Sequence, residues 1–206
     1  MAIRIEVRHQ AALAGQVVES HAQQPIAGAQ VQVVSAPAGF MAMLALRQKQ
    51  YGTAWDSLAS RPDRTLAAPD GHFHFLDLPD GDYTLAASLP AGGSRYGSVQ
   101  GTATVKRDGS GNLKPVILSL AVSSTTVQGK VTKQAGGDPI PVAAIRVQGS
   151  GETVYTVADG TFRLLAIEKG SRTINASAPG FQASSQVVVL ANAGDTEVLN
   201  FALTAA

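Results

Sequence analysis

The chain has 206 residues and a formal net charge of +1, because 16 Lys and Arg residues nearly balance 15 Asp and Glu residues. It has no cysteine, which excludes disulfides, thiolate nucleophiles and cysteine-ligated zinc. The charges are scattered and no apolar run approaches the roughly 18 residues of a membrane helix, so we expect neither nucleic-acid binding nor membrane insertion. The abundance of Val, Ala, Gly, Thr and Ser favours β-structure over a helical bundle.

The N-terminal residues, MAIRIEVRHQ, alternate apolar Ile3, Ile5 and Val7 with charged residues, which predicts a strand with one apolar face. This strand could complete the first sheet or add to the edge of a neighbouring chain. The segment lacks the apolar region of a secretory signal peptide. We therefore expect the chain to be cytoplasmic as synthesised, and a place in an exported or extracellular assembly stays open.

Two long gapless matches indicate an internal duplication. Residues 13–34 match residues 127–148 with an offset of 114, and residues 68–88 match residues 157–177 with an offset of 89. The matched pairs include glycines, prolines and alternating apolar residues: Gly15 with Gly129, Pro25 with Pro139, Ile26 with Ile140, Gly71 with Gly160, and Phe73 with Phe162. The difference between the offsets indicates an insertion in the first repeat.

Each repeat consists of short alternating segments separated by turn residues, which predicts an antiparallel two-sheet sandwich. Asp-Gly pairs at 70–71, 80–81 and 159–160 have the composition of turns that need a positive φ angle. We expect one sandwich over residues 1–121 and a second over residues 122–206. The small polar residues 121–126 are expected to form a short hinge between them.

The insertion, about 37–66, interrupts the strand pattern of the first repeat. Its large apolar residues recur at helical spacing, although Gly52 favours a kinked helix or a helix pair. The segment either covers an edge of its own sandwich or docks a protein partner. In the second case the candidate binding residues are Phe40, Met41, Leu44, Tyr51, Trp55 and Leu58.

The motif DGHFHF places His72 and His74 two residues apart. Because side chains alternate along a strand, both imidazoles point outward if Phe73 and Phe75 face the core. A metal site would need further ligands, and the second repeat has Thr161 and Arg163 at the equivalent positions. We therefore treat the two histidines as weak metal candidates and expect no metal and no other cofactor.

The order G-x-V, P-I-x-x-A-x-V-x-V, D-G-x-F-x-F and G-x-Y-x-L resembles the carboxypeptidase regulatory-like domain, a transthyretin-like (prealbumin-type), Ig-like sandwich. The first repeat has it as GQV, PIAGAQVQV, DGHFHF and GDYTL, and the second as GKV, PIPVAAIRV, DGTFRL and GSRTI, where Arg172 replaces the usual aromatic residue. The resemblance implies two tandem domains of this family. It also implies a non-catalytic role, because members of the family usually accompany other proteins or larger assemblies.

No catalytic residues are assigned. The sequence has no G-x-S-x-G motif, and the C-terminal Tyr-Arg-Gly-Ser-type signature of transthyretin-like hydrolases is absent. We expect a non-enzymatic structural or protein-interaction module, a component of a larger bacterial assembly such as a surface structure or a phage-tail-like particle. The alternative is a carbohydrate- or surface-binding accessory module, for which Tyr83, Tyr96 and Tyr155 are sparse stacking candidates. A metal-binding or hydrolytic enzyme on the same fold is the third interpretation.

Overall fold

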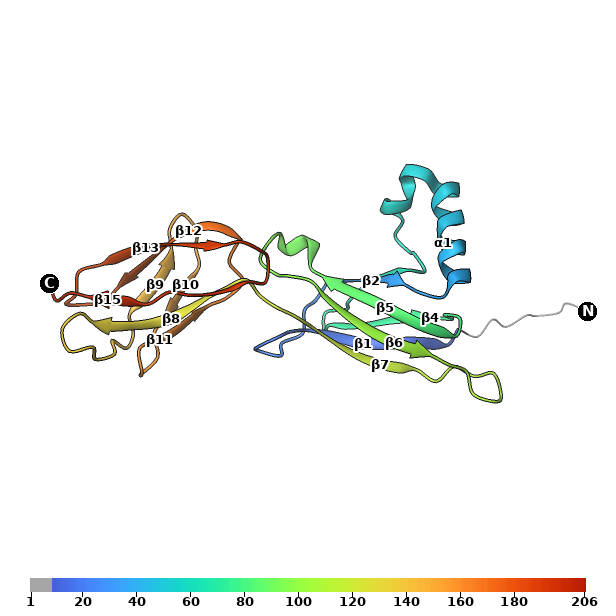
Figure 1. Ribbon diagram of the computed structural model, residues 1–206, viewed down its shortest axis with the longest axis horizontal. Coiled ribbons are helices and arrows are strands. Elements are labelled where there is room, and N and C mark those ends of the chain that lie inside the picture. Colours follow the sequence, from blue (N-terminus) through green and yellow to red (C-terminus); the bar gives the residue numbers. More distant parts are fainter. Residues whose placement is uncertain (1–8) are drawn as a thin grey trace, which may run out of the picture. The chain divides into compact units, whose positions relative to one another are not determined.

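The computed structural model describes residues 9–206, so the predicted N-terminal strand lies outside the described residues. Within them the chain forms two compact units, one of residues 9–91 and 98–122 and the other of residues 92–97 and 123–206. Strands dominate both units (Figure 1), which confirms the all-β prediction. Among the described helices, none is long and apolar enough to cross a membrane.

The first unit is a sandwich of two sheets. One sheet has the order β4-β1-β7, with strands β4 (His72–Leu76), β1 (Ala11–Glu19) and β7 (Val116–Val122). The other has the order β3-β2-β5-β6, with strands β3 (Arg64–Leu66), β2 (Gln30–Ser35), β5 (Gly81–Ser88) and β6 (Val99–Val105). A short 3-10 helix, η2 (Pro90–Gly92), follows β5. Buried residues alternate with exposed ones along β4 and with half-buried ones along most of β5, so one face of each sheet lines the core.

The second unit repeats this arrangement. Its first sheet joins β11 (Thr161–Leu164), β8 (Thr126–Lys133) and β14 (Thr196–Val198), and β15 (Phe201–Leu203) also pairs with β8. Its second sheet has the order β10-β9-β12-β13, with β10 (Thr153–Tyr155), β9 (Ala144–Val147), β12 (Gly170–Ser177) and β13 (Ser184–Leu190). The strand order therefore matches that of the first unit, with β14 and β15 together taking the place of β7.

The sheets differ from the expected purely antiparallel pairing at one place in each unit. Strands β1 and β7 run parallel, and β8 runs parallel to both β14 and β15. The last strand of each unit crosses to the sheet that holds the first strand and lies beside it in the same direction. Alternation of apolar residues specifies which face of a strand is buried but carries no information on strand direction.

A glycine shared by the two repeats permits this parallel pairing. A Cβ atom on Gly15 would lie 2.1 Å from the Leu118 carbonyl oxygen and 2.8 Å from the Phe73 ring. At the equivalent Gly129, a Cβ atom would lie 1.8 Å from the Leu199 carbonyl oxygen. Neither position has room for a side chain, which explains why both repeats have glycine there.

The DGHFHF prediction is confirmed in its geometry. Phe73 and Phe75 are buried with their rings in edge-to-face contact at 6.3 Å, and His72 and His74 are exposed on the other face of β4. Gly71 has the positive φ angle of 76° that the preceding turn requires. The equivalent Gly160 has a φ of 79°, so the predicted Asp-Gly turns occur in both units.

The insertion is helical in its first part. Helix α1 (Ala38–Tyr51) ends where Gly52 takes a positive φ of 56°, and the 3-10 helix η1 (Gly52–Ser57) follows (Figure 1). The predicted insertion extended to residue 66, but residues 64–66 are strand β3, which pairs with β2. Three residues are too short for an alternating pattern to be recognised in sequence.

Candidate functional site

The outward histidines of β4 are exposed and accompanied by few potential ligands. His72 Nδ1 lies 3.2 Å from Asp70 Oδ2, and the backbone N–H of His72 is the main cause that lowers the pKa of Asp70. His9 forms an ion pair with Asp77. Within residues 9–206 the structure has no group of three or more His, Asp or Glu side chains placed to hold a metal ion.

An edge-to-face aromatic contact joins the insertion to the first sandwich, and a buried ionic cluster holds the second half of the insertion together. The Phe40 ring meets the buried Tyr83 ring edge-to-face at 5.9 Å. The Arg61 guanidinium carbon lies 4.4 Å from the centre of the Trp55 ring. Arg61 also donates two hydrogen bonds to the buried Asp63, at 3.0 and 2.6 Å, and this pairing is the main cause that raises the pKa of Arg61. The insertion is therefore a packed part of the first unit.

A cavity of about 450 Å³ lies between the insertion and strand β2. Met41, Leu44 and Trp55 line it together with Val34, and Asp56, Asp63 and Arg61 supply its charged groups. Of the six predicted binding residues, Phe40, Leu44 and Trp55 are buried, Leu58 is half-buried, and Met41 and Tyr51 are exposed. The most exposed large apolar side chain of α1 is Leu46, at 68%, which the sequence analysis did not select.

The tyrosines considered for carbohydrate stacking have different environments. Tyr83 is 1% exposed, donates a hydrogen bond from its hydroxyl to the Pro79 carbonyl at 2.9 Å, and has a pKa raised to about 12 by burial. Tyr96 is half-buried. Only Tyr155 among the three is exposed, at 62%, so the three do not form a stacking platform.

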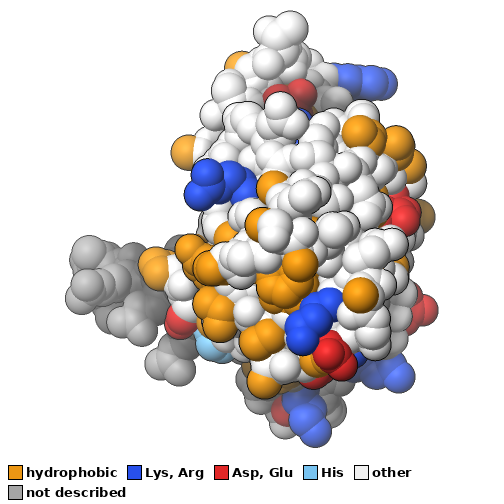
Figure 2. Space-filling model, turned by 90° about the vertical axis from the view of Figure 1, so that its left-hand side faces the viewer, with side chains coloured by type: hydrophobic (Ala, Val, Ile, Leu, Met, Phe, Trp, Pro, Cys, Tyr) orange, Lys and Arg blue, Asp and Glu red, His pale blue; other side chains and the backbone are white. Residues whose placement is uncertain are grey.

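The second unit has a larger groove, of about 670 Å³, beside strands β8, β10 and β11. Its apolar lining includes Val154, Tyr155, Val157 and Val198, and its charged lining residues are Lys130 and Arg163. Figure 2, which faces the end of the second unit, shows hydrophobic side chains gathered on this unit next to basic and acidic side chains.

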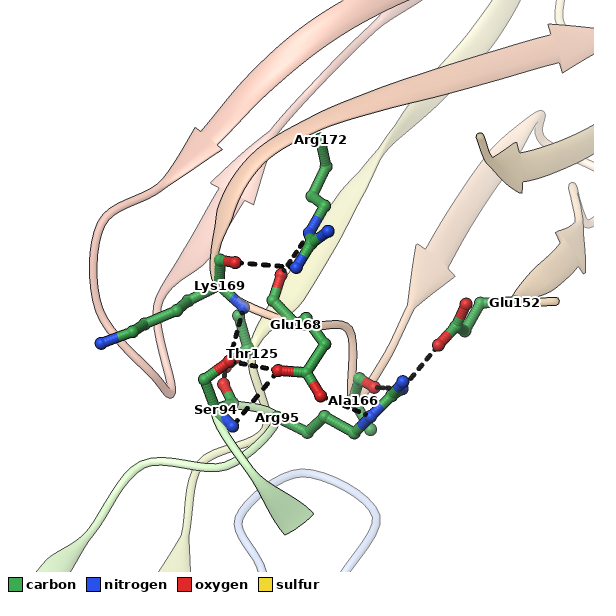
Figure 3. Close-up of polar contacts among 8 residues, drawn as sticks. All are labelled: Ser94, Arg95, Thr125, Glu152, Ala166, Glu168, Lys169 and Arg172. Carbon is green, nitrogen blue, oxygen red and sulfur yellow. Dashed lines mark hydrogen bonds and ion pairs between the residues drawn. The ribbon is translucent and has the colours of Figure 1, made fainter. Parts of the chain in front are cut away.

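A polar cluster fixes residues 92–97 within the second unit. Arg95 donates hydrogen bonds to Glu152 Oε1 at 2.5 Å and to the Ala166 carbonyl at 2.6 Å, and its Nε lies 3.1 Å from Glu168 Oε1 (Figure 3). The Ser94 hydroxyl also donates to Glu168. These contacts join a segment between β5 and β6 to loops of the second unit.

The segment that follows β7 is part of the same cluster. The Thr125 hydroxyl donates to the Ser94 carbonyl at 2.9 Å, and the Thr125 backbone N–H donates to the Arg95 carbonyl at 2.8 Å. Ser124, Thr125 and Thr126 are almost completely buried. Small polar residues led us to expect a short hinge over 121–126, and within that stretch the hydroxyls of Ser124, Thr125 and Thr126 form hydrogen bonds inside the second unit.

The carboxylates of the cluster are stabilised in their charged form. The pKa of Glu152 is lowered to about 2, mainly by the Ser150 side chain and next by Arg95. Ser94 is the main cause that lowers the pKa of Glu168. Sequence reasoning did not find this cluster, because Arg95 is more than fifty residues away from its partners along the chain. The departure from the family pattern at Arg172 was a partial signal, since the Arg172 side chain donates to the Glu168 carbonyl at 2.9 Å.

Several solved structures resemble the chain at low identity. The shaft pilin SpaA from Lactobacillus rhamnosus GG has a TM-score of 0.43 and 10% identity over 97% of this chain and 98% of its own. The Streptococcal ancillary pilin has a TM-score of 0.40 and 11% identity, covering 98% of this chain and 64% of its own. The Bacillus anthracis TIE protein has a TM-score of 0.40 and 14% identity, covering 95% of this chain and 34% of its own.

The sequence of the second unit is similar to a known family. A search of curated proteins found no match to the chain. The model of the carboxypeptidase regulatory-like domain matches residues 126–204, which run from the start of β8 to just beyond β15. The resemblance stated for the second repeat is thus confirmed by the match of residues 126–204 to this family model.

Proposed function

We propose that the chain is a tandem of two carboxypeptidase regulatory-like domains. The two units share one strand order, with the first strand between the fourth and the last. They also share the glycines at 15 and 129. A Cβ atom would clash with the carbonyl oxygen of Leu118 in β7 at Gly15, and with that of Leu199 between β14 and β15 at Gly129. These correspondences support a common origin for both sandwiches, with the α1 insertion as an addition to the first.

We infer that this tandem is a non-enzymatic protein-interaction module within a larger bacterial assembly, such as a surface structure or a phage-tail-like particle. The observation that carries this inference is the contrast between buried and exposed apolar side chains in the insertion. Phe40 anchors it on Tyr83 of the sandwich, while Leu46 and Tyr51 of α1 stay 68% and 46% exposed. A helix held this firmly needs no apolar side chains on its outer side for folding, and exposed apolar groups are typical of protein contacts.

The assembly proposal is tested on the tagged full chain in its native cells. Size-exclusion chromatography with light scattering should find the wild-type chain in particles far larger than its own 21.2 kDa. The variant Leu46→Glu should elute as a free chain, because it removes the most exposed large apolar side chain of α1 and leaves the buried Phe40 and Trp55 unchanged.

The matched control is Gln100→Glu, an exposed substitution on β6 of the same unit, which should leave the particles intact. A wild-type chain that elutes alone would contradict the assembly role. Particles that persist in Leu46→Glu would show that the insertion is not the contact.

A further inference from the structure

The groove of the second unit combines exposed apolar side chains with unpaired positive charge. Tyr155, Val157 and Val198 are 62%, 58% and 63% exposed around a volume of about 670 Å³. None of the lining residues is acidic. Large apolar side chains left open to solvent beside a groove are typical of a surface that another molecule covers.

The positive charges of this groove form no ion pair in the described part of the chain. Neither Lys130 nor Arg163 belongs to an ion pair there, and Arg163 Nε is buried without a hydrogen-bond acceptor. The nearby Asp159 interacts with Lys130 only through its charge, because its carboxylate accepts hydrogen bonds from the backbone N–H and the hydroxyl of Thr161 at 2.9 and 2.7 Å. A buried guanidinium N–H without an acceptor is rare in native proteins, and a carboxylate matches its geometry.

The groove also borders two open strand edges. Among the described strands, β10 pairs only with β9, and β11 pairs only with β8. Each strand therefore has an edge without a strand neighbour, where an extended peptide can form main-chain hydrogen bonds. A polysaccharide has no backbone of that spacing, so the open edges favour a peptide.

The first unit has a groove at the corresponding place. It has a volume of about 460 Å³, and it is lined by Arg64 and Leu66 of β3 and by His74 of β4. By the repeat offset of 89, Leu66 and His74 occupy the positions of Tyr155 and Arg163. This groove too has basic residues and no acidic ones in its lining. An exposed apolar residue beside basic side chains is thus present in both units.

We propose that the groove of the second unit binds an extended, acidic segment of a partner protein. A carboxylate of the segment pairs with Arg163 and Lys130, and its neighbouring apolar side chains pack on Tyr155, Val157 and Val198. This inference rests on the proposed interaction function but concerns a different surface from the α1 insertion. It names the chemistry of the second contact: alternating acidic and apolar residues in a strand.

The test uses the purified full chain and a fluorescein-labelled peptide of alternating valine and glutamate, with a valine–lysine peptide as its counterpart. Fluorescence anisotropy should detect binding of the glutamate peptide, weakened by salt, and none of the lysine peptide. Arg163→Gln and Lys130→Gln should each reduce the affinity about tenfold, since each removes a charge-assisted contact. Labelled-amide NMR should place the shifted signals in β10 and β11.

The matched control is Lys169→Gln, which removes one positive charge from an exposed residue of the same unit outside the groove and should not change the affinity. Melting curves check that every variant is folded. Equal binding of the two peptides, no binding at millimolar peptide, or an unchanged affinity of Arg163→Gln would overturn the proposal. Binding of trigalacturonate in place of the peptide would overturn it in favour of an acidic polysaccharide. Because the assembly test is made in cells on an α1 variant, failure of either proposal is distinguishable from failure of the other.

Discussion

Replacement of Arg95 by alanine should destabilise the second unit more than the first. The residue lies between β5 and β6, in the chain stretch of the first repeat, but its guanidinium contacts Glu152, Glu168 and the Ala166 carbonyl, all in the second unit. Arg95→Ala removes these three contacts at once. It also removes the positive charge next to Glu152, whose Oε2 atom is buried and has no hydrogen-bond partner.

The expected magnitude follows from the exposure of the partners. The side chains of Arg95 and Glu152 are 35% and 23% exposed, so water screens this ion pair and it contributes about 0.2–1 kcal/mol. The charged hydrogen bond to the Ala166 carbonyl adds about 1.5 kcal/mol. The free energy of unfolding should therefore fall by about 2 kcal/mol, which lowers the melting temperature of a unit of this size by roughly 8–16 °C.

The two units can be followed separately in one sample. Trp55 is the only tryptophan and lies in the first unit, so its fluorescence reports the unfolding of that unit alone. Scanning calorimetry records both transitions, and Arg95→Ala should lower the one that Trp55 does not report. Lys169→Ala is the control, because it removes a nearby positive charge whose side chain forms no ion pair among the described residues. A shift of the Trp55 transition alone, or equal shifts in both variants, would refute the reasoning.

Three further changes test other parts of the structure. The pKa of Glu152 is lowered from 4.5 to about 2 in the folded chain, so its contribution to stability is present above pH 4.5 and is lost as the pH falls towards 2. In calorimetry, the stability of Glu152→Gln should therefore depend less on pH than that of the wild type. Equal pH dependence of the two proteins would contradict this. Asp63→Ala should lower the free energy of unfolding by about 3 kcal/mol in urea titrations followed by Trp55 fluorescence, because it leaves Arg61, whose side chain is 5% exposed, without its buried partner. The control is Asp56→Ala, which should cost less than about 1 kcal/mol because the Asp56 side chain is 88% exposed. Gly129→Ala should destabilise the second unit by about 3 kcal/mol in calorimetry, since its Cβ would lie 1.8 Å from the Leu199 carbonyl oxygen. The control is Gly151→Ala, where a Cβ meets open space. A loss of stability in Gly129→Ala no larger than in this control would refute the clash.

The sequence alone predicted only part of the candidate site. The sequence placed apolar residues at helical spacing in the insertion, but the helix ends at Tyr51, so Trp55 lies on a separate 3-10 turn and packs under Arg61. Spacing alone could not tell which of these residues face the sandwich. The exposure of Leu46 and the burial of Phe40 depend on how the insertion lies on the first sandwich, which is a tertiary property.

The sequence by itself determined the architecture of each sandwich. The alternation in β4 decides that Phe73 is buried and His74 exposed, and the Asp-Gly pairs decide where strands reverse, because both follow from local backbone geometry. Only the tertiary structure decided that β1 runs parallel to β7 and that residues 92–97 belong to the second unit. These features depend on contacts between residues far apart in the chain, such as Arg95 with Glu152, and such contacts leave no periodic signal in the sequence.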